Sequence, residues 1–166
     1  MRKFLSAFFV LFSLLWISSS ALASPTTVST MSGKIVGVED DGIRVFKGIP
    51  YAKPPVGELR FAPPQRMESW SEPLEATQYG PTAVQVRELE GLPMSEDCLT
   101  LNIWTPARTD NKDKLPVYVY IHGGGYAIGS GSEAMCNGSS FARNGIVCVS
   151  INYRLNALGF FSNRTT

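Results

Sequence analysis

The sequence predicts an α/β fold built on a pair of parallel strands. Residues 116–121 and 146–151 are apolar, uncharged and of strand length, as in strands buried on both faces. The glycine-rich stretch and short helical segment between them are typical of a crossover between parallel strands. The first strand breaks abruptly into His122 and three glycines, which predicts a loop at the strand's end.

The first 23 residues have the pattern of a signal peptide. A basic start at residues 1–3 precedes an apolar run at residues 4–17, and residues 21–23 form an A-x-A cleavage site. The apolar run is short for a membrane span, so no stable membrane anchor is expected. Cleavage near Ala23 would leave residues 24–166 as the mature domain, secreted to the extracellular space or the periplasm.

Composition indicates a globular protein. The 166 residues are 44% hydrophobic and 17% charged, which is too apolar for disorder and fits one domain or part of one. The net charge is +1 without a cluster of Lys and Arg, so no nucleic-acid partner is expected. The spacing of Cys and His indicates no metal site, and no cofactor is predicted.

The mature chain is expected to begin with a β-hairpin. Residues 24–32 would form an extended lead-in, and residues 33–38 and 43–49 are short β runs. Asp41-Gly42 between these runs is a favoured hairpin turn.

A proline-rich stretch, residues 50–64, follows the hairpin. Its prolines exclude regular helix and central strand. Apolar residues between the prolines predict an ordered loop pressed against a core, and Trp70 is expected to anchor the irregular segment that follows. Residues 82–92 show little periodicity, and we expect a mobile tip there. The apolar residues of the loop are Tyr51, Val56, Leu59 and Phe61.

The second half of the chain predicts three strands and a helix. Residues 96–104 form a strand with Leu99, Leu101 and Ile103 on one face and Trp104 on the other. Residues 115–121 and 146–151 form the buried parallel pair. A short helix is expected at residues 139–144, with Gly145 as its C-terminal cap.

Three cysteines and two sequons remain. Cys148 lies within an apolar strand and is expected to be a small buried side chain. Cys98 and Cys136 could pair or stay free, and an odd count leaves at least one thiol unpaired within the chain. Asn137 and Asn163 begin glycosylation sequons, and their modification depends on the host.

The three glycines after His122 allow two interpretations. Such a run can present backbone N–H groups to a ligand or to a developing negative charge. It can also be a tight turn that needs only positive φ. The glycines alone do not decide between these two.

Several motifs in one order resemble the type-B carboxylesterase family, the carboxylesterase and cholinesterase branch of the α/β-hydrolases. The resemblance runs from about residue 33 to residue 161. The motifs are FKGIPYA at 46–52, PPVG at 54–57, LRF at 59–61, SEDCL at 95–99, LN at 101–102, HGGG at 122–125 and NYR at 152–154.

The resemblance implies the N-terminal part of an α/β-hydrolase fold: a β-hairpin, Pro-rich loops and the first strands of the central mixed sheet. It also implies a serine esterase that hydrolyses a small-molecule carboxylic ester through an acyl-serine intermediate. Gly124 and Gly125 then correspond to oxyanion-hole donors, with His122 and Gly123 supporting their loop.

Two other features come with the resemblance. Arg60 and Glu96 match a structural ion pair of the family. Cys98 matches a cysteine that usually pairs with an upstream one. Residues 81–85, where that partner would lie, contain no cysteine, so the sequence puts this disulfide in doubt and leaves a free Cys98 thiol as one of two alternatives.

None of the catalytic triad is found. The family's nucleophile lies in Gly-x-Ser-x-Gly after the oxyanion loop. Gly138-Ser139-Ser140-Phe141-Ala142 is the nearest match, but it lacks the last glycine and precedes its strand. His122 is the single histidine and comes before the expected serine, so it is not the triad base.

We therefore expect a fragment of an ester hydrolase, from a truncated, frameshifted or split gene, that is inactive by itself. Its parallel strands would keep an unpaired edge, which predicts an aggregation-prone or partly molten chain. The alternatives are a non-catalytic cholinesterase-like binding protein and a truncated pseudogene product. The intact glycine loop favours the hydrolase.

Overall fold

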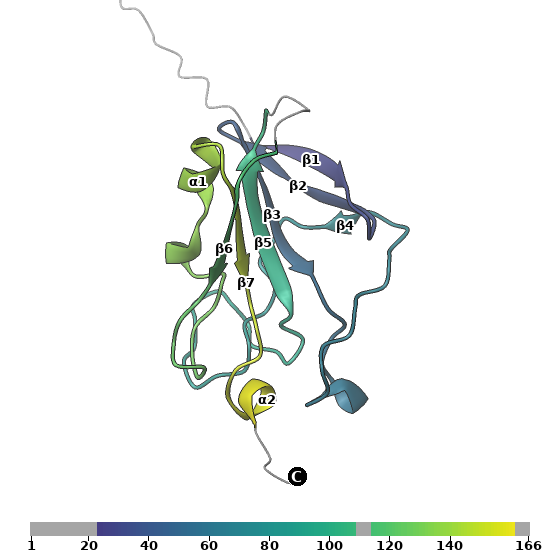
Figure 1. Ribbon diagram of the computed structural model, residues 1–166, viewed down its shortest axis with the longest axis vertical. Coiled ribbons are helices and arrows are strands. Elements are labelled where there is room, and N and C mark those ends of the chain that lie inside the picture. The colour runs from purple at the N-terminus through teal and green to yellow at the C-terminus, as the bar shows by residue number, and fades with distance from the viewer. Residues whose placement is uncertain (1–22, 109–113, 162–166) are drawn as a thin grey trace, which may run out of the picture.

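The computed structural model describes residues 23–108 and 114–161 (Figure 1). Its strands form one mixed sheet in the order β1-β2-β3-β5-β7-β6, with β4 beside β2. The predicted signal peptide, apart from Ala23, and the sequon at Asn163 lie outside the described residues. The elements are β1 (Ser24–Ser29), β2 (Lys34–Asp40), β3 (Ile43–Pro50), η1 (Gly57–Leu59), β4 (Leu74–Glu75), β5 (Thr100–Pro106), β6 (Val117–Ile121), η2 (Ala134–Cys136), α1 (Ser139–Arg143), β7 (Val147–Ile151) and α2 (Asn156–Phe160).

The predicted hairpin is present as β2 and β3. Asp41 and Gly42 both have positive φ, 47° and 75°, as a two-residue type I′ turn requires. The lead-in before the hairpin is not merely extended, because β1 pairs antiparallel with β2 over its whole length. Sequence patterning missed β1 because it is mostly polar, and Val28 is the residue that packs against the core.

The parallel pair is confirmed. β6 and β7 run parallel in continuous register from Val117 opposite Val147 to Ile121 opposite Ile151. The connection between them contains η2 and α1. Helix α1 ends at Arg143, one residue earlier than predicted. Gly145 follows with φ of 79°, the left-handed conformation that terminates helices.

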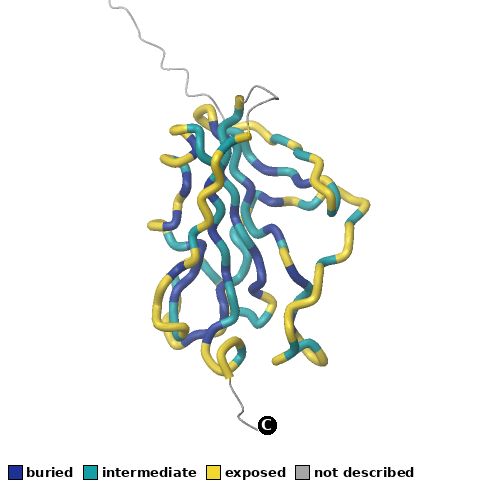
Figure 2. The backbone as a smooth tube through the Cα atoms, in the orientation of Figure 1, coloured by how far each residue is buried: buried dark blue, intermediate teal, exposed yellow. Residues whose placement is uncertain are grey.

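β6 is neither buried nor central, contrary to prediction. It lies at the end of the sheet, paired with β7 alone among the described strands, and it is largely exposed (Figure 2). Val117, Val119 and Ile121 are 61%, 52% and 63% exposed. The sequence carries the apolar pattern of a strand covered on both faces. Among the described elements, α1 contacts β6 through Phe141, whose ring stacks on Tyr118, and the face with Val117, Val119 and Ile121 stays open. The free edge agrees with the expectation of an unpaired edge.

β5 is confirmed as a strand but begins at Thr100 and ends at Pro106, later than predicted at both ends. Its two faces alternate as expected. The more deeply buried face carries Asn102 and Trp104, whereas Leu101 and Ile103 are half-buried on the other. Asn102 can occupy the buried face because both of its side-chain polar atoms are hydrogen-bonded.

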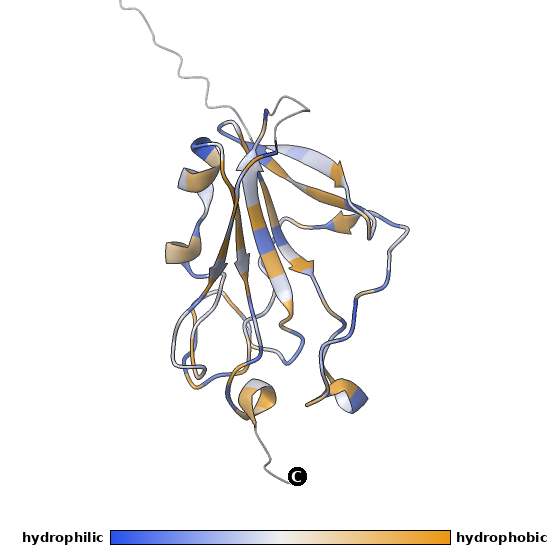
Figure 3. Cartoon of the chain, viewed as in Figure 1, coloured by the Kyte–Doolittle hydropathy of each residue, from blue (hydrophilic) through white to orange (hydrophobic). Residues whose placement is uncertain are grey.

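The sheet has an apolar cluster on each face. The first cluster includes side chains near β4 and Trp70, and the second lies between the sheet and α1. Figure 3 shows hydrophobic residues along much of β6 and β7 as well. The first cluster is formed by Ile35, Phe46, Ile49 and Ala76, and the second by Ile43, Trp104, Ala142 and Cys148.

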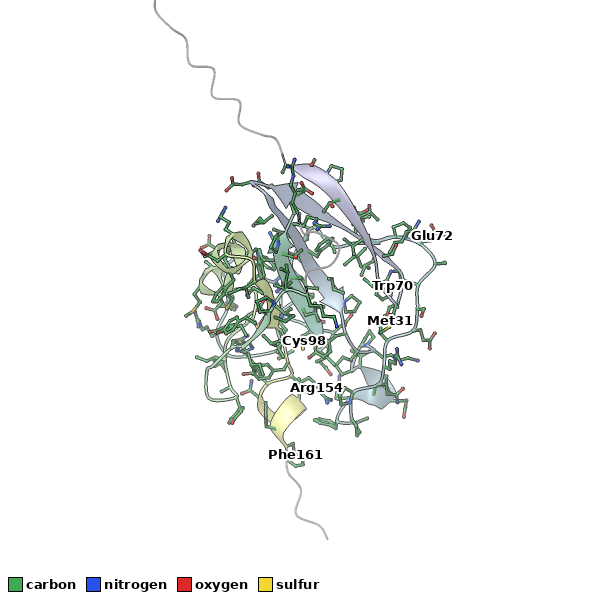
Figure 4. The ribbon with its side chains drawn as sticks, turned by 45° about the horizontal axis from the view of Figure 1, so that its top comes forward. Met31, Trp70, Glu72, Cys98, Arg154 and Phe161 are labelled. Carbon is green, nitrogen blue, oxygen red and sulfur yellow. The ribbon has the colours of Figure 1, made fainter. Side chains whose placement is uncertain are left out.

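Trp70 anchors its segment as predicted. Its Nε1 donates a hydrogen bond to the Lys34 carbonyl at 2.8 Å, and its ring packs on the first cluster (Figure 4). The proline-rich loop is ordered differently from the prediction: Ala52 and Pro55 are buried, while Val56 and Phe61 are 45% and 62% exposed. Alternation of apolar residues in a proline-rich segment therefore did not identify its inward side.

All three cysteines are free and buried. Cys148 packs in the cluster under α1 and is buried, as predicted. The sequence left the state of Cys98 open, and the structure has it as a free thiol. Burial raises the pKa of the Cys98 thiol to about 11, and the carboxylate of Asp97 adds to the rise. In the described part of the chain, no helix has the length and apolarity needed to cross a membrane.

The free edge of β6 should make the isolated chain self-associate, because its five residues carry no charge and expose apolar side chains. We expect Val119→Lys to raise the monomeric fraction of residues 24–166 in sedimentation velocity. Val86→Lys is the matched control, since Val86 is 93% exposed in a loop away from β6. Equal monomer fractions for the two variants would show that β6 is not the contact surface.

Candidate functional site

The candidate site is a hollow at the carboxyl ends of β6 and β7, toward the lower end of the sheet in Figure 1. Crevices at the carboxyl ends of strands are the usual ligand sites of open α/β sheets. The hollow has a volume of about 640 Å³ and is open to solvent. Its lining consists of Ile121, His122, Gly123, Gly124, Gly125, Tyr126, Ile151, Tyr153 and Phe160.

Two glycines of the loop have backbone conformations that favour glycine. Gly124 has φ of 122°, and a Cβ at this position would overlap the carbonyl oxygen of Ile128. The Gly124 carbonyl accepts hydrogen bonds from the N–H groups of Ala127 and Ile128, both at 3.2 Å, which closes the turn. Gly125 has φ of 62° and faces open space.

The N–H groups of Gly124 and Gly125 are uncommitted. Neither donates a hydrogen bond to any residue that the structure describes. Both glycines line the hollow, so a ligand oxygen placed there could accept from them. The geometry therefore requires glycine for the turn and also leaves donors available, so it accommodates both interpretations of the glycine run.

His122 is buried behind the turn, 5% exposed. Its Nδ1 lies 2.8 Å from the Gly123 carbonyl oxygen, and because a carbonyl only accepts, Nδ1 carries the proton. The imidazole stacks on the Tyr153 ring at 4.3 Å between centroids, and the Tyr153 hydroxyl donates to the His122 carbonyl at 2.6 Å. These contacts fix the direction in which the chain enters the glycines.

An aromatic wall faces the glycines. Tyr126, at φ of 61°, packs on Phe160 with 4.5 Å between ring centroids, and Phe160 meets Tyr153 edge to face. Helix α2 brings Phe160 to this position. The sequence did not predict α2, because it is five residues long and no side chain caps its N-terminus.

Two buried asparagines fasten the far end of the loop to the sheet. The Asn152 Oδ1 accepts from the Gly131 N–H at 2.8 Å and from the Ser130 hydroxyl at 2.9 Å. The Asn102 Nδ2 donates to the Gly131 carbonyl of the loop at 3.4 Å and to the Ser150 hydroxyl at 3.1 Å, and its Oδ1 accepts from the Gly48 N–H of β3 at 3.0 Å. Asn102 belongs to the LN motif at 101–102 and Asn152 to the NYR motif at 152–154, two of the motifs that carried the resemblance. In this structure both motifs hold the loop that follows the glycines.

Gln85 is a residue that sequence reasoning missed. It lies in the segment of little periodicity, residues 82–92, whose tip was expected to be mobile, yet Thr82, Ala83 and Gln85 are all buried. Its side-chain amide bonds with both the N–H and the carbonyl of Gly129. An isolated polar residue in an irregular segment carries no pattern that could have identified it.

Arg60 and Glu96 form a two-pronged ion pair through Nε and Nη2. The hydrogen bond to Glu96, and then its charge, raise the pKa of Arg60. Arg60 follows η1 and Glu96 precedes β5, so the pair joins two loops. Both side chains are partly exposed, so the pair orients the loops more than it stabilises the fold.

The ion pair is not part of the hollow. Arg60 and Glu96 line a separate small pocket together with Cys98 and Arg154, which lie close together at the lower end of the sheet (Figure 4). Among residues 23–108 and 114–161, no cluster of His, Cys, Asp and Glu could hold a metal ion. The predicted site residues thus divide into one group around the glycines, residues 122–125, and one structural pair.

Both sequence and structure comparisons find esterases as relatives of this chain. The para-nitrobenzyl esterase of Bacillus subtilis is 44% identical over 80% of this chain, and mouse carboxylesterase 1D is 42% identical over 92% of it. The carboxylesterase EST55 of Geobacillus stearothermophilus superposes with a TM-score of 0.74 at 46% identity, covering 81% of this chain and 27% of that one.

The matches cover only part of these relatives. The chain spans 28% of the length of the para-nitrobenzyl esterase and 31% of carboxylesterase 1D. The solved relatives have the α/β-hydrolase fold, of which the mixed sheet described here is an N-terminal part. The profile of the carboxylesterase family matches residues 24–166, the whole sequence after the predicted signal peptide. The chain therefore belongs to the carboxylesterase family.

Proposed function

We propose that this chain supplies the oxyanion-binding loop of a serine hydrolase that acts on small carboxylic esters. The observation that carries the proposal is the pair of uncommitted N–H groups, those of Gly124 and Gly125, at the edge of an apolar hollow. The esterases among the relatives support the ester as the substrate class. A tight turn alone would also leave these two exposed N–H groups to water, so the esterases among the relatives are what favour the oxyanion role.

The chemistry follows from where charge develops. When a serine oxygen attacks an ester carbonyl, the carbonyl oxygen becomes an oxyanion, and donors already aimed at it lower the barrier. Loss of one such donor costs about 2.7–4 kcal/mol of transition-state stabilisation. His122 has a supporting role in this scheme, because its Nδ1 proton is directed at the Gly123 carbonyl.

The serine and its base are outside what this chain supplies. The 166 residues contain no Gly-x-Ser-x-Gly sequence and no histidine besides His122. The proposed role is therefore one wall of an active site that needs further polypeptide.

We expect the purified 166-residue chain to be inactive. It should neither hydrolyse para-nitrophenyl acetate nor become labelled by a fluorophosphonate probe, because no activated serine is present. The B. subtilis para-nitrobenzyl esterase is the positive control for both assays. Stoichiometric labelling of a serine in this chain would contradict the assignment of roles.

The glycine loop can be tested in a hybrid enzyme in which residues 24–166 replace the matching N-terminal region of the para-nitrobenzyl esterase. We expect the hybrid to hydrolyse para-nitrophenyl acetate. Gly125→Ala should lower its kcat about tenfold or more, because an alanine there strains the left-handed backbone and places a methyl group in the open hollow where the ester oxygen would lie.

Gly145→Ala is the matched control. Gly145 also has left-handed φ, 79°, and also faces open space, so the backbone strain is similar, but it lies beyond α1, away from the hollow. Equal kcat values for the two variants would refute the oxyanion role. A folded but inactive parent hybrid would favour the non-catalytic binding protein.

We also propose that the chain is secreted after cleavage behind Ala23. Two observations support this boundary: β1 begins at Ser24, and the family match begins at the same residue. The basic start and apolar run of residues 1–17 supply the signal.

Expression with the native N-terminus in a host that has a secretory pathway should release a product that begins at Ser24. Mass spectrometry of the intact secreted protein measures this directly. Ala23→Lys is expected to block processing, because the cleavage site requires a small residue. Secreted material that retains residues 1–23 would contradict the proposal.

A further inference from the structure

Gln85 makes a two-way contact with one residue of the glycine-rich loop. Its Nε2 donates to the Gly129 carbonyl at 3.0 Å, and its Oε1 accepts from the Gly129 N–H at 2.7 Å. The same Nε2 lies 2.6 Å from the Thr82 hydroxyl and 3.2 Å from the Ala83 carbonyl, so its own segment fixes the direction of the amide. The side chain is 7% exposed, and both of its polar atoms are satisfied.

Gly129 in turn contacts the residues that lead into the glycines. Its φ is 114°, and a Cβ there would come within 2.5 Å of the His122 Nδ1 and 2.6 Å of the Gly123 carbonyl oxygen. The Gly129 backbone therefore lies directly against the hydrogen bond that orients His122. A shift of Gly129 must move this bond, and Gly124 follows it immediately in the chain.

A second side-chain amide fastens the same stretch. The Asn156 Nδ2 donates to the carbonyls of Val84 and Ala127, both at 3.1 Å, and its N–H donates to the Tyr126 carbonyl at 2.8 Å. Asn156 is exposed, so water competes for its hydrogen bonds. Gln85 is buried, so its hydrogen bonds to the loop are shielded from water.

We propose that Gln85 is a positioning residue for the oxyanion loop. It holds Gly129 against His122 and thereby sets the direction of the N–H groups of Gly124 and Gly125. It touches no reacting atom, and its role rests on the proposed ester hydrolysis.

The first test is kinetic, in the hybrid enzyme. Gln85→Leu introduces an apolar side chain of similar size and removes both bonds to Gly129. We expect kcat to fall about tenfold or more with little change in KM, because the donors act on the transition state. Gln78→Leu is the control, since Gln78 is exposed and makes no side-chain hydrogen bond within the described residues.

The second test uses a substitution that restores the bonding pattern reversibly. A neutral Glu at position 85 offers one O–H donor and one acceptor, which matches the two bonds to Gly129, whereas a carboxylate has no donor. The kcat of Gln85→Glu relative to the parent hybrid should therefore rise as pH falls through the pKa of the new carboxyl. Glu133, in the same loop, and its partner Arg87 are present in both proteins, so their effect cancels in the ratio.

The third test needs no activity. Hydrogen–deuterium exchange of residues 123–131, measured by mass spectrometry on the dilute 166-residue chain, should be faster in Gln85→Leu than in Gln78→Leu. A purely local packing role for Gln85 predicts equal exchange in this segment and a ratio of kcat values that does not depend on pH.

The outcomes separate the two proposals. If Gly125→Ala leaves kcat unchanged, the oxyanion role fails whatever Gln85 does. If Gly125→Ala lowers kcat while Gln85→Leu matches Gln78→Leu in both kinetics and exchange, the oxyanion role stands and the positioning role of Gln85 is refuted.

Discussion

The architecture of this site depends on buried side-chain amides that replace secondary structure where the chain is irregular. Between β6 and α1 the backbone cannot pair with a neighbouring strand, yet part of it is buried and its N–H and carbonyl groups need partners. Asn152 meets this need at Gly131, and Gln85 meets it at Gly129. Each amide offers a donor and an acceptor, as a peptide group does, and so orders the loop where no strand pairs with it.

The strands and the hairpin turn could be predicted from the sequence, but the side-chain amides that hold the loop could not. Strands β3 and β7 and the turn at Asp41-Gly42 follow local rules of apolar pattern and turn chemistry, which a single sequence displays. The bond between Gln85 and Gly129 joins residues 44 positions apart through one side chain. No periodicity marks such a contact, so it becomes visible only when the fold brings the segments together.

The errors have physical causes as well. β6 was expected to be buried because its residues are apolar on both faces, but composition reports what a strand is suited to contact, not what lies beside it. β1 was missed because a strand at the edge of a sheet can be mostly polar and still pair along its whole length. The glycine loop was placed correctly because a strand that ends in His-Gly-Gly-Gly combines a local pattern with a family resemblance.

The open edge of β6 also has a geometric consequence for how an active site here would be completed. A strand added there in the direction of β6 and β7 would have its carboxyl end beside the hollow, next to Gly124 and Gly125. Pairing the open edge and bringing a new side chain to the two N–H groups would then be a single event. If the proposed oxyanion role holds, assembly and catalytic competence would be thermodynamically coupled, because the free energy gained by pairing the open edge of β6 would also hold the reacting groups together.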